Sequence, residues 1–218
     1  MNFPFKFPFL IIFFLFASLT LVNSQNIDSI FVNMPSRVNP LLNRQTKLKM
    51  LNNCKKQIPD SVQNTLGGKS AVIKYDSVSN FIRIQNAANS KMEIFAIKTT
   101  QGNSAIGVIS TVGDTLQNSE IQFFNPDWTP AEIVFRKPEI KDWIKPENNT
   151  ENGTTSAWAS EQTAVGFITL EYNAQKTQLK AQHNFLKYIS DDVKDLVNPH
   201  FNQEPLLYVL QGNEWIKQ

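Results

Sequence analysis

The chain of 218 residues has 21 basic and 19 acidic residues, a net charge of +2, and a single cysteine. A charge this close to zero excludes a protein whose overall field attracts nucleic acid or a charged substrate. One cysteine excludes an intrachain disulfide, so the fold must rest on a hydrophobic core, for which this length suffices.

The first twenty-four residues have the pattern of a secretory signal peptide. An apolar run from Phe9 to Val22 follows Lys6, and Val22 and Ser24 stand where a signal peptidase reads. The run is shorter than the ~20 residues of a membrane span, although a single lysine leaves a retained N-terminal anchor as the alternative. We expect cleavage after Ser24 and an exported, soluble protein, periplasmic or extracellular, with no transmembrane span. Cys54 lies too far along the chain to make it a lipoprotein.

After this leader, the pattern predicts an α+β fold made mainly of antiparallel sheet. Apolar residues at helical spacing after Pro40 predict an N-terminal helix over residues 40–57. Runs of β-forming residues follow at a spacing of about ten, too short for parallel crossovers and therefore typical of antiparallel hairpins. These strands are predicted at residues 71–75, 81–85, 92–98, 105–111 and 120–124.

The second half of the chain again combines sheet and helix. Residues 146–156 are polar and without periodicity, which predicts a long exposed loop. The other predicted elements are a short helix at 139–143, strands at 164–172 and 176–182, a helix at 185–197 packed on the sheets, and a hairpin at 206–210 and 215–216. We expect one exported domain over residues 25–218, or two packed halves divided near this loop.

The stretch Leu66-Gly67-Gly68-Lys69-Ser70 has the ending of a phosphate-binding loop. That loop needs a first glycine where this chain has Gln63, and it follows a strand and opens a helix. Here a predicted strand follows the glycines instead. We therefore interpret Gly67 and Gly68 as a flexible turn that starts the first strand of the sheet.

No other motif indicates catalysis or metal binding. The two histidines, His183 and His200, lie on different predicted elements and belong to no metal-ligand spacing. Asp191 and its acidic neighbours suit the first turn of a helix, where the helix dipole favours negative charge. Cys54 falls on the apolar stripe of a predicted helix and is interpreted as a small buried residue. We assign no catalytic, metal-binding or cofactor-binding residue and expect no cofactor.

Four residues are candidates for a binding surface. Between residues 36 and 56 the chain has six basic residues and no acid, among them Arg44 and Lys47, which suits an anionic glycan or lipid or, more simply, a solvated helix face. Trp128 and Trp158 could stack on a sugar, although most tryptophans belong to a core. Trp158, directly after the polar loop, is the one we expect to be exposed.

Several short motifs share a resemblance to one family. They are Ile30-Phe31-Val32-Asn33-Met34-Pro35, Pro40-Leu41-Leu42 with Arg44, Leu66-Gly67-Gly68-Lys69-Ser70, and Ser119-Glu120-Ile121-Gln122-Phe123-Phe124 with Trp128. Together they resemble a family of uncharacterised exported proteins from Bacteroidetes, a domain of unknown function, over about residues 27–144. The chain departs from that family at Gln45, Thr46 and Lys47, where the family tends to have acids. The resemblance implies the location and the architecture and supplies no catalytic residue.

Four Asp-Ser or Asp-Thr pairs are each followed by an aliphatic residue. This pattern resembles the acceptor sequence of periplasmic O-glycosylation in the same bacterial group. The alternative is ordinary turn and cap chemistry, for which such pairs are well suited. The candidate acceptors are Ser29, Ser61, Ser77 and Thr115.

Two classes of function remain open. The first is a non-catalytic envelope or periplasmic protein that binds a partner protein, peptide or glycan, with no nucleic acid. The alternative is a hydrolase of cell-wall or glycan bonds that uses carboxylates brought together by folding. The lack of a nucleophile paired with a base favours a binding module over an enzyme. An open pocket with two facing carboxylates and a raised pKa would favour the hydrolase.

Overall fold

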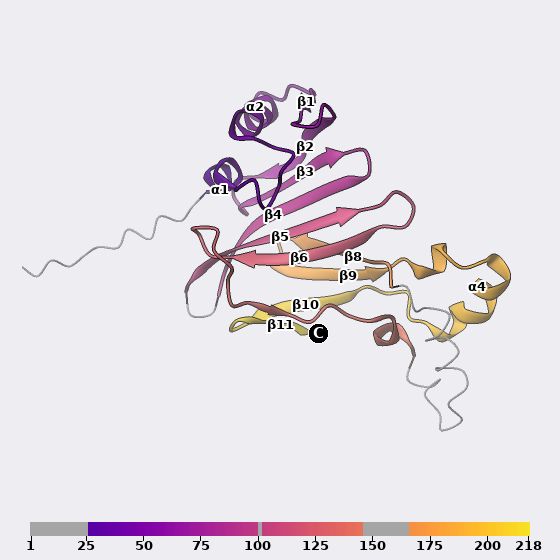
Figure 1. Ribbon diagram of the computed structural model, residues 1–218. Helices are drawn as coiled ribbons and strands as arrows, with labels where there is room; N and C mark the ends of the chain where they lie inside the picture. The colour runs from indigo at the N-terminus through magenta and orange to yellow at the C-terminus, as the bar shows by residue number, and fades with distance from the viewer. Residues whose placement is uncertain (1–25, 100–101, 146–165) are drawn as a thin grey trace, which may run out of the picture.

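The computed structural model describes residues 26–99, 102–145 and 166–218, which form two β-sheets and several short helices (Figure 1). The helical elements are α1 (Ile27–Asn33), α2 (Arg44–Lys55), α4 (Asp191–Val197) and the 3₁₀ turns η1 (Ile140–Trp143), η3 (Phe185–Lys187) and η4 (Asn198–His200). The strands are β1 (Val62–Gln63), β2 (Lys69–Asp76), β3 (Phe81–Ala87), β4 (Ser90–Lys98), β5 (Ser104–Val112), β6 (Asn118–Phe124), β7 (Val134–Phe135), β8 (Ile168–Asn173), β9 (Gln178–His183), β10 (Leu206–Gln211) and β11 (Glu214–Lys217).

The first sheet has the strand order β1-β2-β3-β4-β5-β6, and the second has the order β7-β11-β10-β9-β8. Neighbouring strands are antiparallel, except that β7 and β11 run parallel. The predicted α+β class with mainly antiparallel sheet is therefore confirmed. Among the described helices, none combines the length and the apolar character needed to cross a membrane.

Each of the two N-terminal helices begins at an asparagine. The side chain of Asn26 accepts a hydrogen bond from the backbone N–H of Ser29 at 2.9 Å, and Asn43 accepts one from Thr46 at 2.9 Å. Such caps satisfy donors that have no partner within the helix. The helix predicted at 40–57 is present as α2, whereas α1 was not predicted because two turns offer too few apolar repeats to show a period.

The helix predicted at 185–197 is interrupted. Phe185 lies in the 3₁₀ turn η3 and packs against Phe201, with their ring centroids 4.6 Å apart. The chain then turns and a new helix, α4, starts after Ser190 with Asp191 and Asp192 in its first turn. The acids therefore lie where the helix dipole favours them.

The first sheet is buried on both faces because its strands alternate two sets of apolar side chains. Ile82 and Ile84 of β3 pack in a core with residues of α1 and α2. Phe81 and Phe95 point the other way and join a second core with residues of β8, β9 and β11. The molecule is thus built in three layers, with the helices and the second sheet on opposite faces of the first sheet (Figure 1).

Strand β8 crosses β6, β5 and β4 of the first sheet and forms the edge of the second. The backbone N–H groups of an edge strand lack strand partners, and here side chains of the first sheet supply the acceptors. Ile168 donates to Asn118 Oδ1 at 3.3 Å, Leu170 to Ser119 Oγ at 3.0 Å, and Tyr172 to Glu93 Oε2 at 2.9 Å. We call these three hydrogen bonds the β8 edge contacts. They join the two sheets through polar groups inside an apolar core.

Gly107 on β5 makes room for the aromatic contact between the sheets. Phe95, its register partner on β4, stacks on Tyr172 of β8 with ring centroids 3.8 Å apart and planes 9° apart. A Cβ atom at Gly107 would lie 2.3 Å from the Phe95 ring. Because the ring is held against Tyr172, it has little room to withdraw.

We expect Gly107→Ala to lower the free energy of unfolding by about 1–3 kcal/mol through overpacking. Gly166→Ala is the control, since its added Cβ would meet nothing nearer than Ile140 Cγ1 at 3.6 Å, and it should change stability by no more than about 0.5 kcal/mol. Urea denaturation of both variants measures the difference. Equal stability of the two variants would contradict this account of the core.

Candidate functional site

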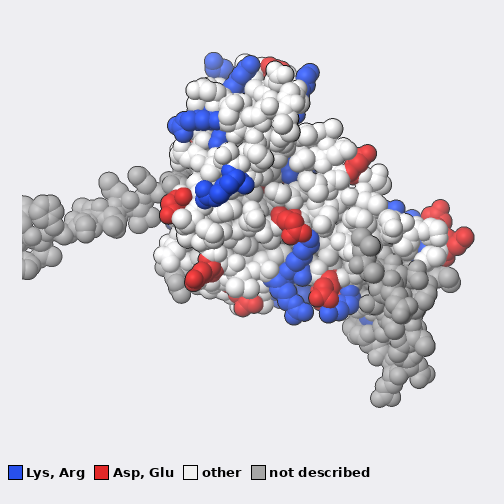
Figure 2. All heavy atoms as spheres, in the orientation of Figure 1, with Lys and Arg blue, Asp and Glu red and all other residues white. Residues whose placement is uncertain are grey.

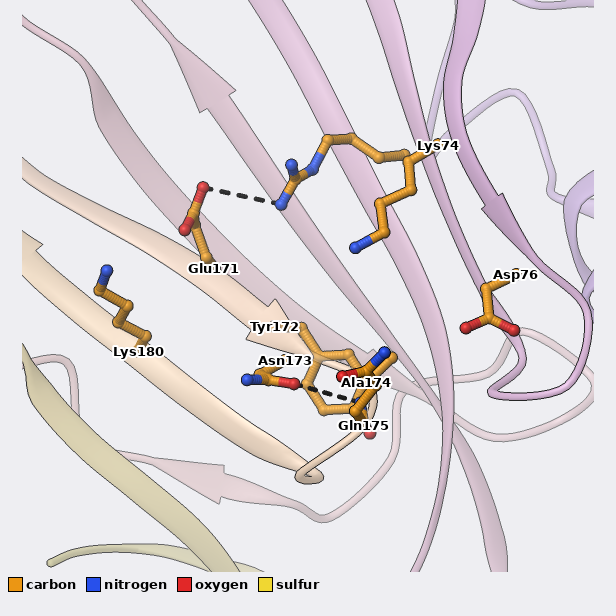
Figure 3. A pocket seen from close by; sticks show the side chains of 9 residues that line it. Lys74, Asp76, Glu171, Tyr172, Asn173, Ala174, Gln175 and Lys180 are labelled. Carbon is orange, nitrogen blue, oxygen red and sulfur yellow. Dashed lines mark hydrogen bonds and ion pairs between the residues drawn. The ribbon is translucent and has the colours of Figure 1, made fainter.

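A pocket of about 440 Å³ opens between the two sheets, beyond the point where β8 crosses β4. Figure 3 shows Lys74 and Asp76 on one side of it and Glu171 and Lys180 on the other. Its lining residues are Lys74, Asp76, Arg83, Glu171, Tyr172, Asn173, Ala174, Gln175 and Lys180. We call it the inter-sheet pocket. Residues of β2, β3, β8, β9 and the β8–β9 turn therefore form one site only after the sheets have packed.

Two other pockets have similar volumes, about 420 and 410 Å³. One lies beside β5 and the loop after β6, with Glu132 as its charged residue. The other lies beside Trp143, with Asp142, Lys145 and Lys217 in its lining. The inter-sheet pocket has the largest number of charged side chains of the three, and charged groups that converge on one cavity are typical of binding sites.

Arg83 is the most firmly held cation of the inter-sheet pocket. Its Nε atom donates to Glu93 Oε1 at 2.9 Å, and its Nη2 atom lies 2.8 Å from the same oxygen. Nη2 also lies 3.6 Å from Glu171 Oε1, across the space between the sheets. Figure 3 draws this contact with Glu171 as a dashed line. The guanidinium plane is thereby fixed along one edge, while its other edge faces the pocket.

Glu93 is a carboxylate with no exposed surface, placed on β4 directly opposite Arg83. Burial raises the pKa of Glu93, and the hydrogen bond from the Tyr172 N–H and the charge of Arg83 partly offset this shift. A buried charge is tolerated when it is paired and fully hydrogen-bonded. Glu93 meets this condition because one oxygen faces Arg83 and the other accepts from Tyr172.

The pair Glu93 and Glu171 resembles the arrangement that would favour a hydrolase, since one member has a raised pKa and both lie near the same arginine. Both oxygens of Glu93 are nevertheless engaged, and its side chain does not line the pocket. A general acid must reach the substrate within hydrogen-bonding distance. In this geometry Glu93 orients Arg83 and holds β8, and Glu171 and Asp76 are the carboxylates that line the pocket.

Two residues of the candidate binding surface are buried. Trp128 is 5% exposed, packs against Phe124 with centroids 5.4 Å apart, and accepts a hydrogen bond from Arg37 at its carbonyl oxygen. Lys47 is 3% exposed and donates to the carbonyl oxygen of Met34. Burial and the nearby charge of Arg44 lower the pKa of Lys47 to about 8. Neither side chain is placed to meet a ligand at the surface.

Arg44 and Trp158 complete that candidate surface. Arg44 Nη1 donates to Asn33 Oδ1 at 2.7 Å, so it joins α2 to the end of α1. Figure 2 shows Lys and Arg side chains around the end of the molecule that contains α2, while both signs of charge occur over the rest of this face. Trp158 lies outside the described residues. Of the three residues that the structure describes, two are buried, so the three form no common exposed surface.

The four candidate acceptors of O-glycosylation lie apart. Ser77 and Thr115 are exposed, Ser77 in the turn between β2 and β3 and Thr115 in the loop between β5 and β6. Ser29 lies in the first turn of α1 and Ser61 directly before β1, both half-buried. The Asp76 side chain accepts from the backbone N–H groups of Val78 and Ser79, which is ordinary turn chemistry. Modification of these residues stays a prediction.

The Gly67-Gly68 segment is a turn, as predicted. Gly67 has φ of 83°, and Lys69 begins β2 directly afterwards. The backbone N–H of Gly68 donates to the side chain of Asn64 at 3.0 Å. Asn64 thus occupies a donor that a phosphate-binding loop would direct at its ligand.

The cysteine and the two histidines do not line the inter-sheet pocket. Cys54 is half-buried on α2, and burial raises the pKa of its thiol, with a smaller contribution from Asp28. His183 packs against Trp143 and Phe185, and burial lowers its pKa. Within the described ranges, no group of three or more His, Cys, Asp or Glu side chains is placed to hold a metal ion.

Sequence reasoning missed Arg83 of the pocket lining and the buried Glu93 that orients it. Arg83 interrupts the strand Phe81-Ile82-Arg83-Ile84, and Glu93 interrupts Met92-Glu93-Ile94-Phe95. Both stand at positions that face the second sheet, where the pattern calls for apolar residues. Opposite charges at inward positions of consecutive strands were the available signal of a buried pair.

The three-layer α+β architecture and the inter-sheet pocket define the class of fold. Comparison with known proteins identifies the family. The chain belongs to the family "Protein of unknown function (DUF3256)", which matches residues 19–215. It is similar to the solved structure of a domain of an uncharacterized protein from Porphyromonas gingivalis W83. The TM-score is 0.74 at 18% identity, over 88% of this chain and 97% of that one. No curated protein matches. The expected membership of a domain family of unknown function is confirmed.

We expect Arg83→Met to destabilise the fold at pH 7 by about 3–5 kcal/mol, because it leaves Glu93 buried without its counter-charge. Since burial raises the pKa of Glu93, its protonated form is better tolerated in the folded state. The deficit should therefore shrink as pH falls from 7 toward the ordinary value of 4.5. Denaturant titrations of wild type and variant at both ends of this range measure it.

The double variant Arg83→Met with Glu93→Gln is the control, because it removes both charges. Its stability relative to wild type should depend less on pH than that of the single variant. A deficit of Arg83→Met that is the same at both pH values would show that Glu93 is not the group left unpaired.

Proposed function

We propose that the protein is an exported, non-catalytic binding module of the cell envelope, and that the inter-sheet pocket is its ligand site. The observation that carries this proposal is the state of Glu93: the one carboxylate there with a raised pKa has both oxygens engaged by Arg83 and Tyr172. The pocket thus offers preorganised cations and hydrogen-bonding groups for binding. Asp76, the other carboxylate of the lining, accepts hydrogen bonds from Ser79 and Val78 that lower its pKa, which does not suit a general acid.

The position of the pocket supports the same proposal. It lies at the outer end of the contact between the sheets, and side chains on rigid strands line most of it. Binding sites built on strands hold their groups more precisely than sites on loops. The leader-like pattern of residues 1–24 supports the exported location, and protein recovered from the envelope fraction should then begin at Gln25. An intact Met1 at the N-terminus would contradict export.

We expect Ala174→Trp to abolish ligand binding, and its melting temperature measures the cost to the fold, because Ala174 also packs against the core. Ala174 lies in the β8–β9 turn and lines the pocket, so a bulky ring there would fill the space that a ligand needs. The matched control is Ala88→Trp, in the turn between β3 and β4 and away from the pocket. Arrays of envelope glycans and peptides identify a ligand, and calorimetry compares wild type with both variants.

The same experiment distinguishes binding from catalysis. Mass spectrometry of the recovered ligand should show an unchanged mass after long incubation. A product that accumulates with wild type and disappears with Glu171→Gln, at unchanged thermal stability, would establish the hydrolase instead.

A further inference from the structure

Two like charges face each other across neighbouring strands in the inter-sheet pocket. Lys74 on β2 and Arg83 on β3 are direct register partners. Like charges at directly opposite positions destabilise a sheet. Arg83 has Glu93 as its counter-charge, whereas Lys74 forms no ion pair with any described residue; its Nζ atom lies 5.4 Å from the centroid of the Phe81 ring. The sheet therefore keeps at the mouth of the pocket a cation without a direct ion pair, whose charge helps to lower the pKa of Asp76 beside it.

A third cation approaches from the second sheet. Lys180 on β9 is the register partner of Glu171 on β8, but no ion pair joins the two. Arg83 uses Nε and Nη2 toward the carboxylates, and Nη1 has no hydrogen-bond partner in the part of the chain that the structure describes. Lys74, Arg83 and Lys180 thus present three nitrogen donors to one cavity, and Figure 3 shows Lys74 and Lys180 on opposite sides of it. Such a set is suited to an oxyanion.

We propose that the inter-sheet pocket binds the carboxylate of an acidic saccharide, an inference that rests on the proposed binding function. Lys74, Arg83 and Lys180 receive the carboxylate, and the remaining groups receive hydroxyls. Asp76 and Glu171 accept hydrogen bonds from hydroxyl groups, since ionised carboxylates are acceptors only. The mixed donors and acceptors match a ligand that carries both a negative charge and many hydroxyls.

The rim of the pocket favours a saccharide over an acidic peptide. Asn173 accepts from the backbone N–H groups of Gln175 and Lys176 with its side-chain oxygen, so its amide nitrogen is left to donate. The exposed side chain of Gln175 adds both a donor and an acceptor. Tyr172 is 6% exposed, so the lining offers little apolar surface to anchor peptide side chains. Several common modes of peptide recognition depend on apolar grooves or pockets.

The test uses a tetramer of galacturonate and, as a neutral control with the same sugar rings, its methyl ester. We expect the galacturonate tetramer to raise the melting temperature of the purified protein and the methyl ester to leave it unchanged, because a ligand that binds the folded state stabilises it. Lys74→Gln and Lys180→Gln should each weaken binding about fivefold or more, and Lys69→Gln, on the same strand as Lys74 but outside the pocket, should not. Added salt should weaken binding further.

Lys74→Gln should also raise the melting temperature of the unliganded protein, because it removes the like charge opposite Arg83. The melting temperature of the unliganded variant therefore distinguishes relief of charge repulsion, which raises it, from a loss of packing, which would lower it. Equal binding of the methyl ester, or equal losses in Lys69→Gln, would overturn the carboxylate assignment.

Further probes separate this inference from the proposed function. Binding of a glutamate-rich peptide instead of either saccharide would overturn the assignment of an acidic saccharide as the ligand. An equal rise of the melting temperature with inorganic phosphate alone would overturn it too. Either result would still be consistent with a binding module. Cleavage of the galacturonate tetramer would be consistent with recognition of the carboxylate, but it would overturn the proposal that the protein is non-catalytic.

Discussion

The hydrogen bond between the buried carboxylate of Glu93 and the backbone N–H of Tyr172 determines how the two sheets meet. It gives the backbone N–H of Tyr172, on the edge strand β8, a hydrogen-bond acceptor. Together with the bonds to Asn118 and Ser119, it fixes the path of β8 across the first sheet. The same carboxylate fixes the guanidinium of Arg83. One residue therefore links the packing of the second sheet to the electrostatics of the pocket. The hydrogen bonds to Tyr172 and Arg83 both offset the free energy lost when the carboxylate of Glu93 is buried.

The position of the pocket follows from this crossing. Because β8 runs from β6 toward β4, its turn into β9 extends beyond the aromatic contact of Phe95 and Tyr172. Beyond that contact the sheets are lined by charged side chains rather than by apolar ones. The transition from core to pocket thus takes place within a few residues of β3 and β8. Lys74 needs no direct ion pair there because water reaches it, whereas Glu93, two strands further in, is fully buried and must be paired.

The sequence predicted α2 and every described strand except the two-residue β1 and β7, because each alternating run such as Phe81-Ile82-Arg83-Ile84 places its side chains on two faces. The helix predicted at 185–197 is interrupted, and α1 was not predicted. The turn at Gly67 and Gly68 followed from the strand pattern after it, where a phosphate-binding loop would open a helix. The site could not be predicted in the same way. Arg83 and Glu171 lie 88 positions apart in the chain, on different sheets, and only the crossing of β8 brings them together. The burial of Trp128 and Lys47 likewise depends on contacts with the N-terminal segment that no local pattern encodes.

Hydrogen exchange at the amide of Tyr172 tests most directly whether Glu93 fixes the second sheet. In wild type this N–H is buried and bonded to Glu93 Oε2, so it should exchange as slowly as the amides of the β4–β5 ladder. In Glu93→Ala the amides of Tyr172 and Leu170 should exchange much faster, while those of Val108 and Ile109 on β5 remain protected. Equal protection of Tyr172 in wild type and variant would contradict the account, because the second sheet would then hold its place without the carboxylate.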